Sequence, residues 1–169
     1  MSERSRQQSA LSADVEKLKT WALSHEDAAA GVWLDNGADA GGPVRIGVGI
    51  VGDVAEAEAR LRALVAHPES LDVVGKDHTE AALRALQQQV SADYLGRAAD
   101  IGSSVTLVGL NLRTNKVRIG ITPFDDVFAA ELLDRYGAEL IEVEHSSPVS
   151  HGPAVAGHRI GYLNETPEG

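Results

Sequence analysis

The sequence has no cysteine, few aromatic residues and a deficit of positive charge, and each shortage excludes a class of protein. Zero cysteines in 169 residues exclude disulfide bonds, thiol nucleophiles and cysteine-ligated zinc sites. Aromatic residues make up 4% of the chain, so the core must be built mainly from aliphatic side chains. A net charge of −10 would repel a phosphate backbone, and we therefore expect no nucleic-acid partner.

Long apolar runs are also absent. No segment approaches the roughly 20 consecutive apolar residues of a membrane span. The start of the chain, Met1 to Ala10, is polar and lacks the apolar core of a secretory signal. We therefore expect no membrane insertion, and a cytoplasmic location unless some other argument places the protein outside the cell.

Hydrophobic periodicity predicts an α+β protein that starts with a helix and a small sheet. Residues 1–10 are typical of a disordered lead, and apolar residues at helical spacing predict an N-terminal helix over 11–30, capped by Ser12. The segment 31–76 then predicts two strands, a helix that opens with Asp53 as its cap, and a brief third strand.

The second half of the chain predicts a similar set of elements. A long connecting helix is expected over 77–102, capped by Asp77. The segment 103–145 predicts a β-hairpin, a helix and a final strand. Residues 146–169 lack any buried periodicity and are expected to form a flexible tail.

An internal repeat connects the two halves. Residues 44–63 align with residues 117–136 at nine identical positions, which include a shared Val-Arg-Ile-Gly strand. The alternative is chance similarity between two strand-helix junctions in a chain rich in alanine and valine. We expect two ββαβ units with small, mostly antiparallel sheets covered by helices, joined by the long helix and preceded by the N-terminal helix.

The predicted hairpin gives the second unit a distinctive surface. A two-residue loop at Thr114-Asn115 would pair Leu110 with Ile119 on the face toward the helices. On the opposite face it would pair Asn111 with Arg118, Gly109 with Gly120, and Leu107 with Thr122. The glycines would leave a surface without side chains, where a partner can approach closely. Alternatively, they only permit twist or a bulge in the strands.

The first unit is expected to differ on the same face. Trp33 is placed to cover Gly47 and Gly49, because aromatic residues often lie over glycines in strands. Together with the N-terminal helix, Trp33 would close this face of the first unit, whereas the glycine face of the second unit would stay open.

Motifs that suggest catalysis or cofactor binding do not meet their structural requirements. The six histidines lack the three- or four-residue spacing of a helical metal site. His145-Ser146-Ser147 lacks a nucleophile elbow and leads into the tail. The stretch from Gly47 to Gly52 spells Gly-x-Gly-x-x-Gly, but its first glycines lie inside a strand and Asp53 would oppose a phosphate. We expect a non-enzymatic protein without cofactor or metal.

Four segments of the sequence are similar, in order and spacing, to a known family of extracellular proteins. They are Gly31 to Asp35, the strand that ends at Gly52-Asp53, Leu83 to Leu86, and above all the hairpin from Val108 to Gly120. The region 31–143 resembles the pro-regions of secreted chymotrypsin-like serine proteases of the streptogrisin and α-lytic type, and related actinobacterial exported proteins. The resemblance implies an extracellular intramolecular chaperone and inhibitor of such a protease.

The resemblance also implies how the partner is held. Its sheet would be extended by a hairpin of the protease, and its tail would lie in the active-site cleft. The partner-binding residues would be Leu107, Gly109, Asn111, Arg118, Gly120, Thr122, His145, Ser146, Ser147, Pro148 and Val149. The alternative is a stand-alone interaction or scaffold protein that binds a peptide, a small ligand or another copy of itself.

Overall fold

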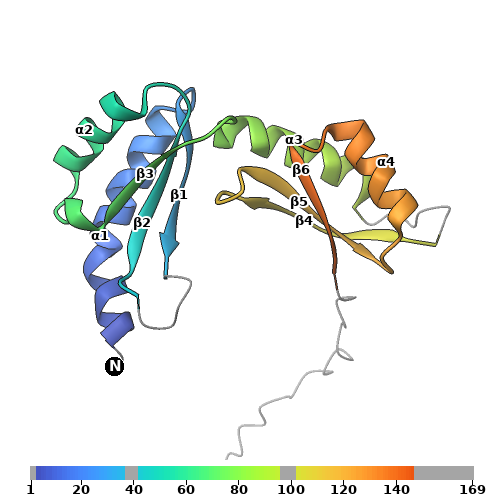
Figure 1. The fold of residues 1–169 in the computed structure, drawn as a ribbon, viewed down its shortest axis with the longest axis horizontal. Coiled ribbons are helices and arrows are strands. Elements are labelled where there is room, and N and C mark those ends of the chain that lie inside the picture. Colours follow the sequence, from blue (N-terminus) through green and yellow to red (C-terminus); the bar gives the residue numbers. More distant parts are fainter. Residues whose placement is uncertain (1–2, 37–41, 96–101, 147–169) are drawn as a thin grey trace, which may run out of the picture.

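The computed structural model describes residues 3–36, 42–95 and 102–146, and they form the α+β fold expected from the sequence (Figure 1). The elements are, in order, α1 (Glu3–Ser24), β1 (Ala29–Asp35), β2 (Arg45–Ile50), α2 (Val54–Leu64), a 3-10 turn (Pro68–Ser70), β3 (Leu71–Gly75), α3 (Glu80–Tyr94), β4 (Ser104–Asn111), β5 (Lys116–Thr122), α4 (Asp126–Tyr136) and β6 (Ile141–His145). No helix among these residues is both long enough and apolar enough to cross a membrane.

The two sheets have the same topology. The first has the strand order β1-β2-β3 and the second β4-β5-β6. In each sheet the first pair of strands is antiparallel and the second pair is parallel. The sheets are therefore mixed rather than mostly antiparallel, because α2 and α4 each return the chain so that it enters the third strand in the direction of the second.

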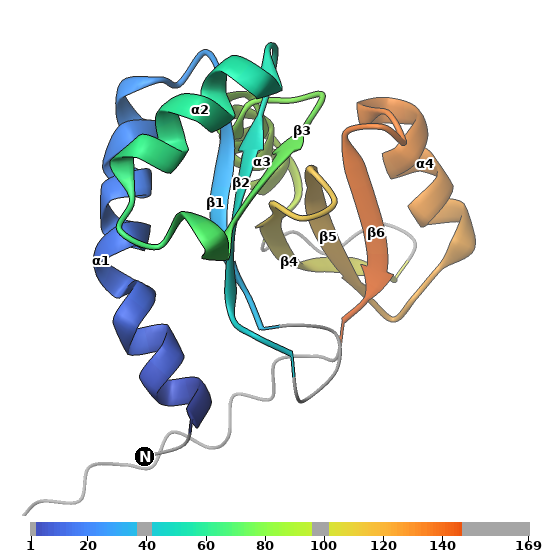
Figure 2. The ribbon, with the colours of Figure 1, turned by 60° about the vertical axis from the view of Figure 1, so that its left-hand side comes forward.

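The repeat contains one more helix than the sequence indicated. Helices α1 and α2 pack on one face of the first sheet, where Leu11 and Leu18 meet Ile46 and Leu61 in one core. Helices α3 and α4 pack in the same way on the second sheet, in a separate core. Figure 2 shows the sheets between α1 and α2 on one flank and α4 on the other. The repeating unit is therefore αββαβ, and α3 is the counterpart of α1 rather than a connector alone.

The N-terminal helix starts earlier and ends earlier than predicted. It begins at Glu3, so a disordered lead over 1–10 is wrong for residues 3–10. Ser12 lies inside the helix, where its hydroxyl donates to the carbonyl of Ser9 at 2.8 Å, and it does not cap the helix. The chain leaves α1 after Ser24, and β1 begins at Ala29, because Ala29 and Ala30 are buried in the sheet.

The caps of the other helices follow the sequence with one exception. Asp53 caps α2, and its carboxylate accepts from the amide of Glu56 at 3.0 Å. Helix α3 is capped by Thr79, whose hydroxyl accepts from the amide of Ala82 at 3.2 Å, rather than by Asp77. The predicted end of α3 near residue 102 falls partly on residues 96–101, which lie outside the described residues.

A buried carboxylate fastens α1 to the rest of the first unit. Asp14 is 1% exposed and accepts hydrogen bonds from the amides of Ala66 and His67 at 2.9 and 3.0 Å and from Nδ1 of His67 at 2.8 Å. Burial raises the pKa of Asp14, but these hydrogen bonds outweigh burial and leave the pKa below its ordinary value. The loop after α2 is thus tied to the middle of α1.

Candidate binding site

The outer face of the second sheet, which no helix of the described residues covers, carries several of the residues that the sequence predicts to bind a partner. Its register differs from the prediction by two residues, since Leu110 pairs with Val117 and Gly109 pairs with Arg118. The loop between β4 and β5 holds four residues, 112–115, rather than two. A slip of two residues leaves every side chain on its predicted face, so Leu107, Gly109, Asn111, Arg118 and Gly120 still share one surface.

The turn explains the difference in register. A two-residue turn of the type common in hairpins needs positive φ at both central residues, or glycine at the first. Among the non-glycine residues described, Asn115 has a positive φ, of 58°, and Thr114 does not. The Asn115 side chain is 5% exposed, because it is engaged by a distant segment of the chain.

We call the surface formed by Leu107, Gly109, Asn111 and Arg118 the open face. A Cβ placed at Gly109 would meet no atom of the described residues within 4 Å. Leu107 lies two residues away on the same strand and is 39% exposed. The predicted surface without side chains is therefore present at Gly109, on the edge strand β4.

Gly120, in contrast, is covered. A Cβ there would lie 2.7 Å from Cβ of Ser146 and 3.0 Å from Cβ of Leu107. The bulge that the sequence left as an alternative is also present, because the register shifts between Val105 and Leu107, next to Gly120. The two glycines therefore have different roles, and Gly109 alone of the pair is bare.

Hydroxyl groups hold the end of β6 against the second sheet. The Thr122 hydroxyl donates to the carbonyl of Ser146 and lies 3.1 Å from the Ser146 hydroxyl, which also contacts the hydroxyl of Thr106. The Ser146 amide donates to the carbonyl of Ile121 at 3.1 Å. His145 is exposed at the end of β6. Ser147, Pro148 and Val149, also expected to bind the partner, lie outside the described residues.

Two acidic side chains on β6 contact residues beside or within the open face. The carboxylate of Glu142 accepts from the side-chain amide of Asn111 at 2.7 Å and from the hydroxyl of Thr114 at 3.0 Å. Arg118 donates to Glu144 at 2.6 Å, and this hydrogen bond and charge raise the pKa of Arg118. Both side chains of the Arg118–Glu144 pair are more than one-third exposed, so the pair contributes little stability but fixes the position of Arg118.

The corresponding face of the first sheet is closed by its own side chains. A Cβ at Gly47 would lie 2.2 Å from Cε2 of Trp33, so the predicted cover over Gly47 is confirmed. Gly49 is covered by Ala30 and Lys76 rather than by Trp33. The ammonium group of Lys76 lies 5.7 Å from the centroid of the Trp33 ring. The N-terminal helix takes no part in this closure, because it packs on the other face of the sheet.

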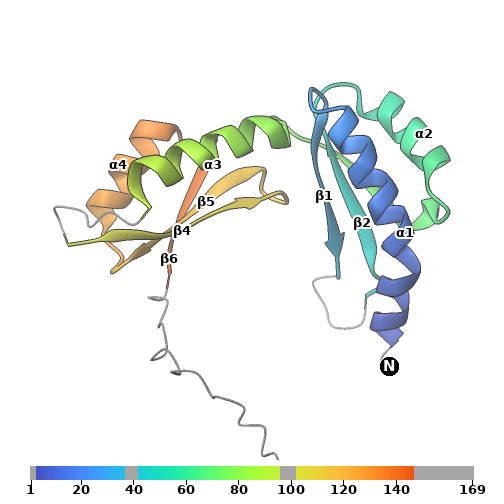
Figure 3. The ribbon, with the colours of Figure 1, turned by 180° about the vertical axis from the view of Figure 1, so that it is seen from behind.

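The tip of the β4–β5 hairpin joins the two units. Arg113 forms an ion pair of 2.6 Å with Asp35, and the ammonium of Lys76 donates to the carbonyl of Arg113 at 2.5 Å. Asn115 donates to the carbonyl of His78 and accepts from its amide, both at 2.8 Å. Figure 3 shows the hairpin reaching toward β1 beneath α3. These contacts hold the first unit, the linker between β3 and α3 (residues 76–79) and the second unit in one arrangement.

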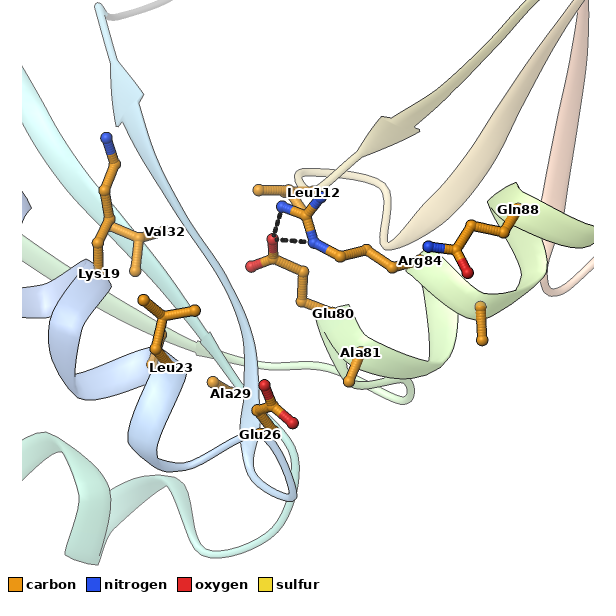
Figure 4. Close-up of a pocket in the computed structure, with 12 residues that line it drawn as sticks. Lys19, Leu23, Glu26, Ala29, Val32, Glu80, Ala81, Arg84, Gln88 and Leu112 are labelled. Atoms are coloured by element: carbon orange, nitrogen blue, oxygen red, sulfur yellow. Dashed lines mark hydrogen bonds and ion pairs between the residues drawn. The ribbon is translucent and has the colours of Figure 1, made fainter. Parts of the chain in front are cut away.

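The joint creates a cleft that sequence reasoning missed. It has a volume of about 590 Å³ and lies between α1 and β1 on one side and α3 with the hairpin on the other (Figure 4). Leu112 forms part of the wall and packs on Gly31, where a Cβ would lie 2.8 Å from it. No local signal could have revealed a cleft whose walls come from separate units.

Within the described ranges, no three His, Asp or Glu side chains gather as they would around a metal ion. No protein-family model matches the chain, and neither a curated protein nor a solved structure was found to match it.

Proposed function

We propose that the protein is a non-catalytic protein-binding module that acts through the open face, with a chymotrypsin-like serine protease as its partner. In this role it assists folding of the protease and inhibits it, outside the cell. The observation that carries the proposal is the difference between two copies of one unit. The first copy covers its face with Trp33, and the second leaves Gly109 bare beside an exposed Leu107.

The strands next to the open face support the proposal. Strands β4 and β6 both lie at edges of the second sheet, so backbone groups of an extended partner segment can pair with either. Such pairing gives affinity, and the face beside it gives specificity. The resemblance to protease pro-regions suggests the same kind of sheet extension.

Charge on β6 favours a different protein over a second copy of this chain. A two-fold pairing of β6 with itself, centred on Val143, would place Glu142 directly opposite Glu144. Like charges in opposite positions destabilise a strand pair. Self-association through this edge is therefore disfavoured, and a partner strand with basic side chains is favoured.

The test is a protease assay with matched variants. The protein is mixed with a streptogrisin-type protease and the residual activity is measured, together with recovery of activity when the denatured protease refolds. We expect inhibition at micromolar concentration. Gly109→Trp should weaken inhibition by about tenfold or more, because the ring fills the bare ground at the centre of the contact.

Asp134→Trp on α4 is the control. It adds the same side chain to an exposed position of the same unit, on the helix-covered side. Equal loss of inhibition in both variants would contradict a role for the open face. No inhibition or binding by the wild type at micromolar concentration would contradict the protease as partner.

A further inference from the structure

We propose that the cleft between the two units binds a small molecule with an aliphatic body and a protonated amine. The volume of about 590 Å³ lies inside the range of roughly 300 to 1,000 Å³ that is usual for ligand pockets, and such pockets often occur between domains. The cleft is separate from the open face, so this inference does not rest on the proposed protease partner.

The walls of the cleft are held in place before any ligand arrives. The Arg113–Asp35 ion pair and the two hydrogen bonds between Asn115 and His78 fix the hairpin against the first unit and the linker. Leu112, which directly precedes Arg113 in the hairpin loop, supplies apolar surface to the cleft. A preformed site of this kind loses little ordering entropy when it binds.

The apolar part of the lining is aliphatic. It consists of Ala22, Leu23, Ala29, Val32, Ala81, Ala85 and Leu112, and none of the described lining residues is aromatic. Leu23 is 75% exposed, so a ligand can remove much of its surface from water. Without aromatic rings the lining offers no stacking for a planar ligand. An alkyl body fits this surface best.

The charges of the lining select the sign of the ligand. Arg84 donates to Glu80 at 3.0 Å on the α3 wall, and Lys19 pairs with Glu16 at 3.2 Å on α1. In the part of the chain that the structure describes, Glu26 is the charged lining residue without an ion pair. The two cations of the lining, Lys19 and Arg84, are each already paired with a carboxylate, whereas Glu26 is available to a cationic ligand.

The position of Glu26 suits an ammonium group. Figure 4 shows its side chain extending from the turn after α1 into the space between the units. A primary alkylamine is protonated at neutral pH, since its pKa is close to the roughly 10.4 of lysine. Its alkyl chain would lie along the alanines of α3, and the amide of Gln88, also in the lining, offers a further hydrogen bond.

The experiment is an NMR titration with three probes of equal chain length: n-octylammonium chloride, 1-octanol and sodium octanoate. Backbone amides of Ala81 and Ala85 and the side-chain amide of Gln88 report on the cleft. We expect saturable shifts there with octylammonium, weaker binding of octanol, and the weakest binding of octanoate. Glu26→Gln should weaken octylammonium by about threefold to fivefold, as for an exposed ion pair, and leave octanol unchanged.

Two tryptophan variants locate the binding. Ala85→Trp should fill the cleft and abolish the saturable shifts, whereas Ala63→Trp, on the exposed surface of α2, should leave them intact. Octanoate that binds as tightly as octylammonium would overturn the proposed charge selection. Saturable shifts that persist in Ala85→Trp, or wild-type shifts that do not saturate, would overturn the site itself.

Discussion

The two units share one backbone plan and differ in how they treat the face that no helix covers. In the first unit the face is closed by Trp33 over Gly47 and by Lys76 and Ala30 over Gly49. In the second unit Leu107 lies opposite Gly120, the glycine that corresponds to Gly47, and no described side chain covers Gly109. A duplicated fold can thus keep its core twice while one copy seals its surface and the other exposes it.

The aspartate contacts that connect the helices of each unit, here called ties, differ in burial as well. The first unit ties α1 to the loop after α2 with Asp14, which is 1% exposed. The second unit ties α3 to α4 with Asp93, which accepts from the hydroxyl of Tyr136 at 2.8 Å and pairs with Arg135 at 3.4 Å, near the surface. We expect the buried contacts of Asp14 to contribute more to the free energy of unfolding than the contacts of Asp93.

The largest loss of stability is expected when the buried contacts of Asp14 are removed. Asp14→Asn should lower the free energy of unfolding by about 2 to 4 kcal/mol, because amide donors that now meet a carboxylate would face an NH₂ group. The matched change Asp93→Asn should cost about 1 kcal/mol or less. Urea unfolding of both variants measures the difference. Equal losses would show that the two ties are equivalent after all.

A smaller effect is expected from filling the glycines. Gly47→Ala should destabilise the protein by about 1 to 3 kcal/mol, because its methyl group overlaps Trp33. Gly109→Ala should be neutral or stabilise by up to about 1 kcal/mol, since its methyl group meets no atom and the unfolded chain loses freedom. The same denaturation assay compares them.

A double variant sharpens this comparison. Trp33→Leu combined with Gly47→Ala gives the first unit a leucine like Leu107, and should lose less stability than the sum of the losses of the two single variants. If the stability loss of the double variant equals the sum of the losses of the two single variants, the overlap with Trp33 is not the cause of the loss in Gly47→Ala.

Removing the hydrogen bonds between Asn115 and His78, which help to join the units, should cause an intermediate to small loss of stability. Asn115→Gly keeps the positive φ of the turn but removes both hydrogen bonds to His78, and should cost about 1 to 2 kcal/mol. It should also broaden the distribution of distances between spin labels at Ala63 and Asp134, one in each unit. An unchanged distribution would show that Asn115 does not fix the arrangement.

Acid should destabilise the first unit, and alkali should destabilise the second. The pKa of Asp14 is lowered in the folded protein, so its stabilisation is present above the unfolded-state value of 3.8 and is lost as pH falls through the folded-state pKa. Burial and the hydrogen bond to Asp93 raise the pKa of Tyr136 from 10.0 to about 12. Its stabilisation is therefore present below pH 10.0 and is lost as pH rises toward 12.

The aromatic residues allow the two losses to be followed separately. Trp21 and Trp33, the two tryptophans of the chain, lie in the first unit, and Tyr94 and Tyr136 lie in the second. Tryptophan fluorescence should change first in acid, and tyrosine circular dichroism first in alkali. The same order of change at both extremes would contradict the assignment of one sensitive group to each unit.

The sequence predicted local patterns well and long-range contacts poorly. Alternation in β2 and β5 and the nine shared identities were enough to predict two ββαβ units and the outward side of Gly109. Helix α3 was not recognised as the counterpart of α1, because the alignment of the repeat covers only a strand and a helix. The role of Asp14 depends on Ala66, far along the chain, and nothing near Asp14 indicates it.

The site shows the same limit. The hairpin loop was predicted two residues too short because Asn115 is held by His78 of the linker, a contact without a local signature. The cleft depends on the joint between units, so its lining from α1, β1, α3 and the hairpin follows only from the assembled structure.

The boundary between the repeats has a consequence for the history of the chain. Because α3 belongs to the second unit, the junction falls between Gly75 and Thr79, and each half carries two helices and a complete three-stranded sheet. A gene segment that encoded α1 to β3 would therefore specify one whole αββαβ unit with its own core, and tandem duplication of that segment would give two such units. After such a duplication, selection could act on one copy's exposed surface while the other copy preserved the scaffold.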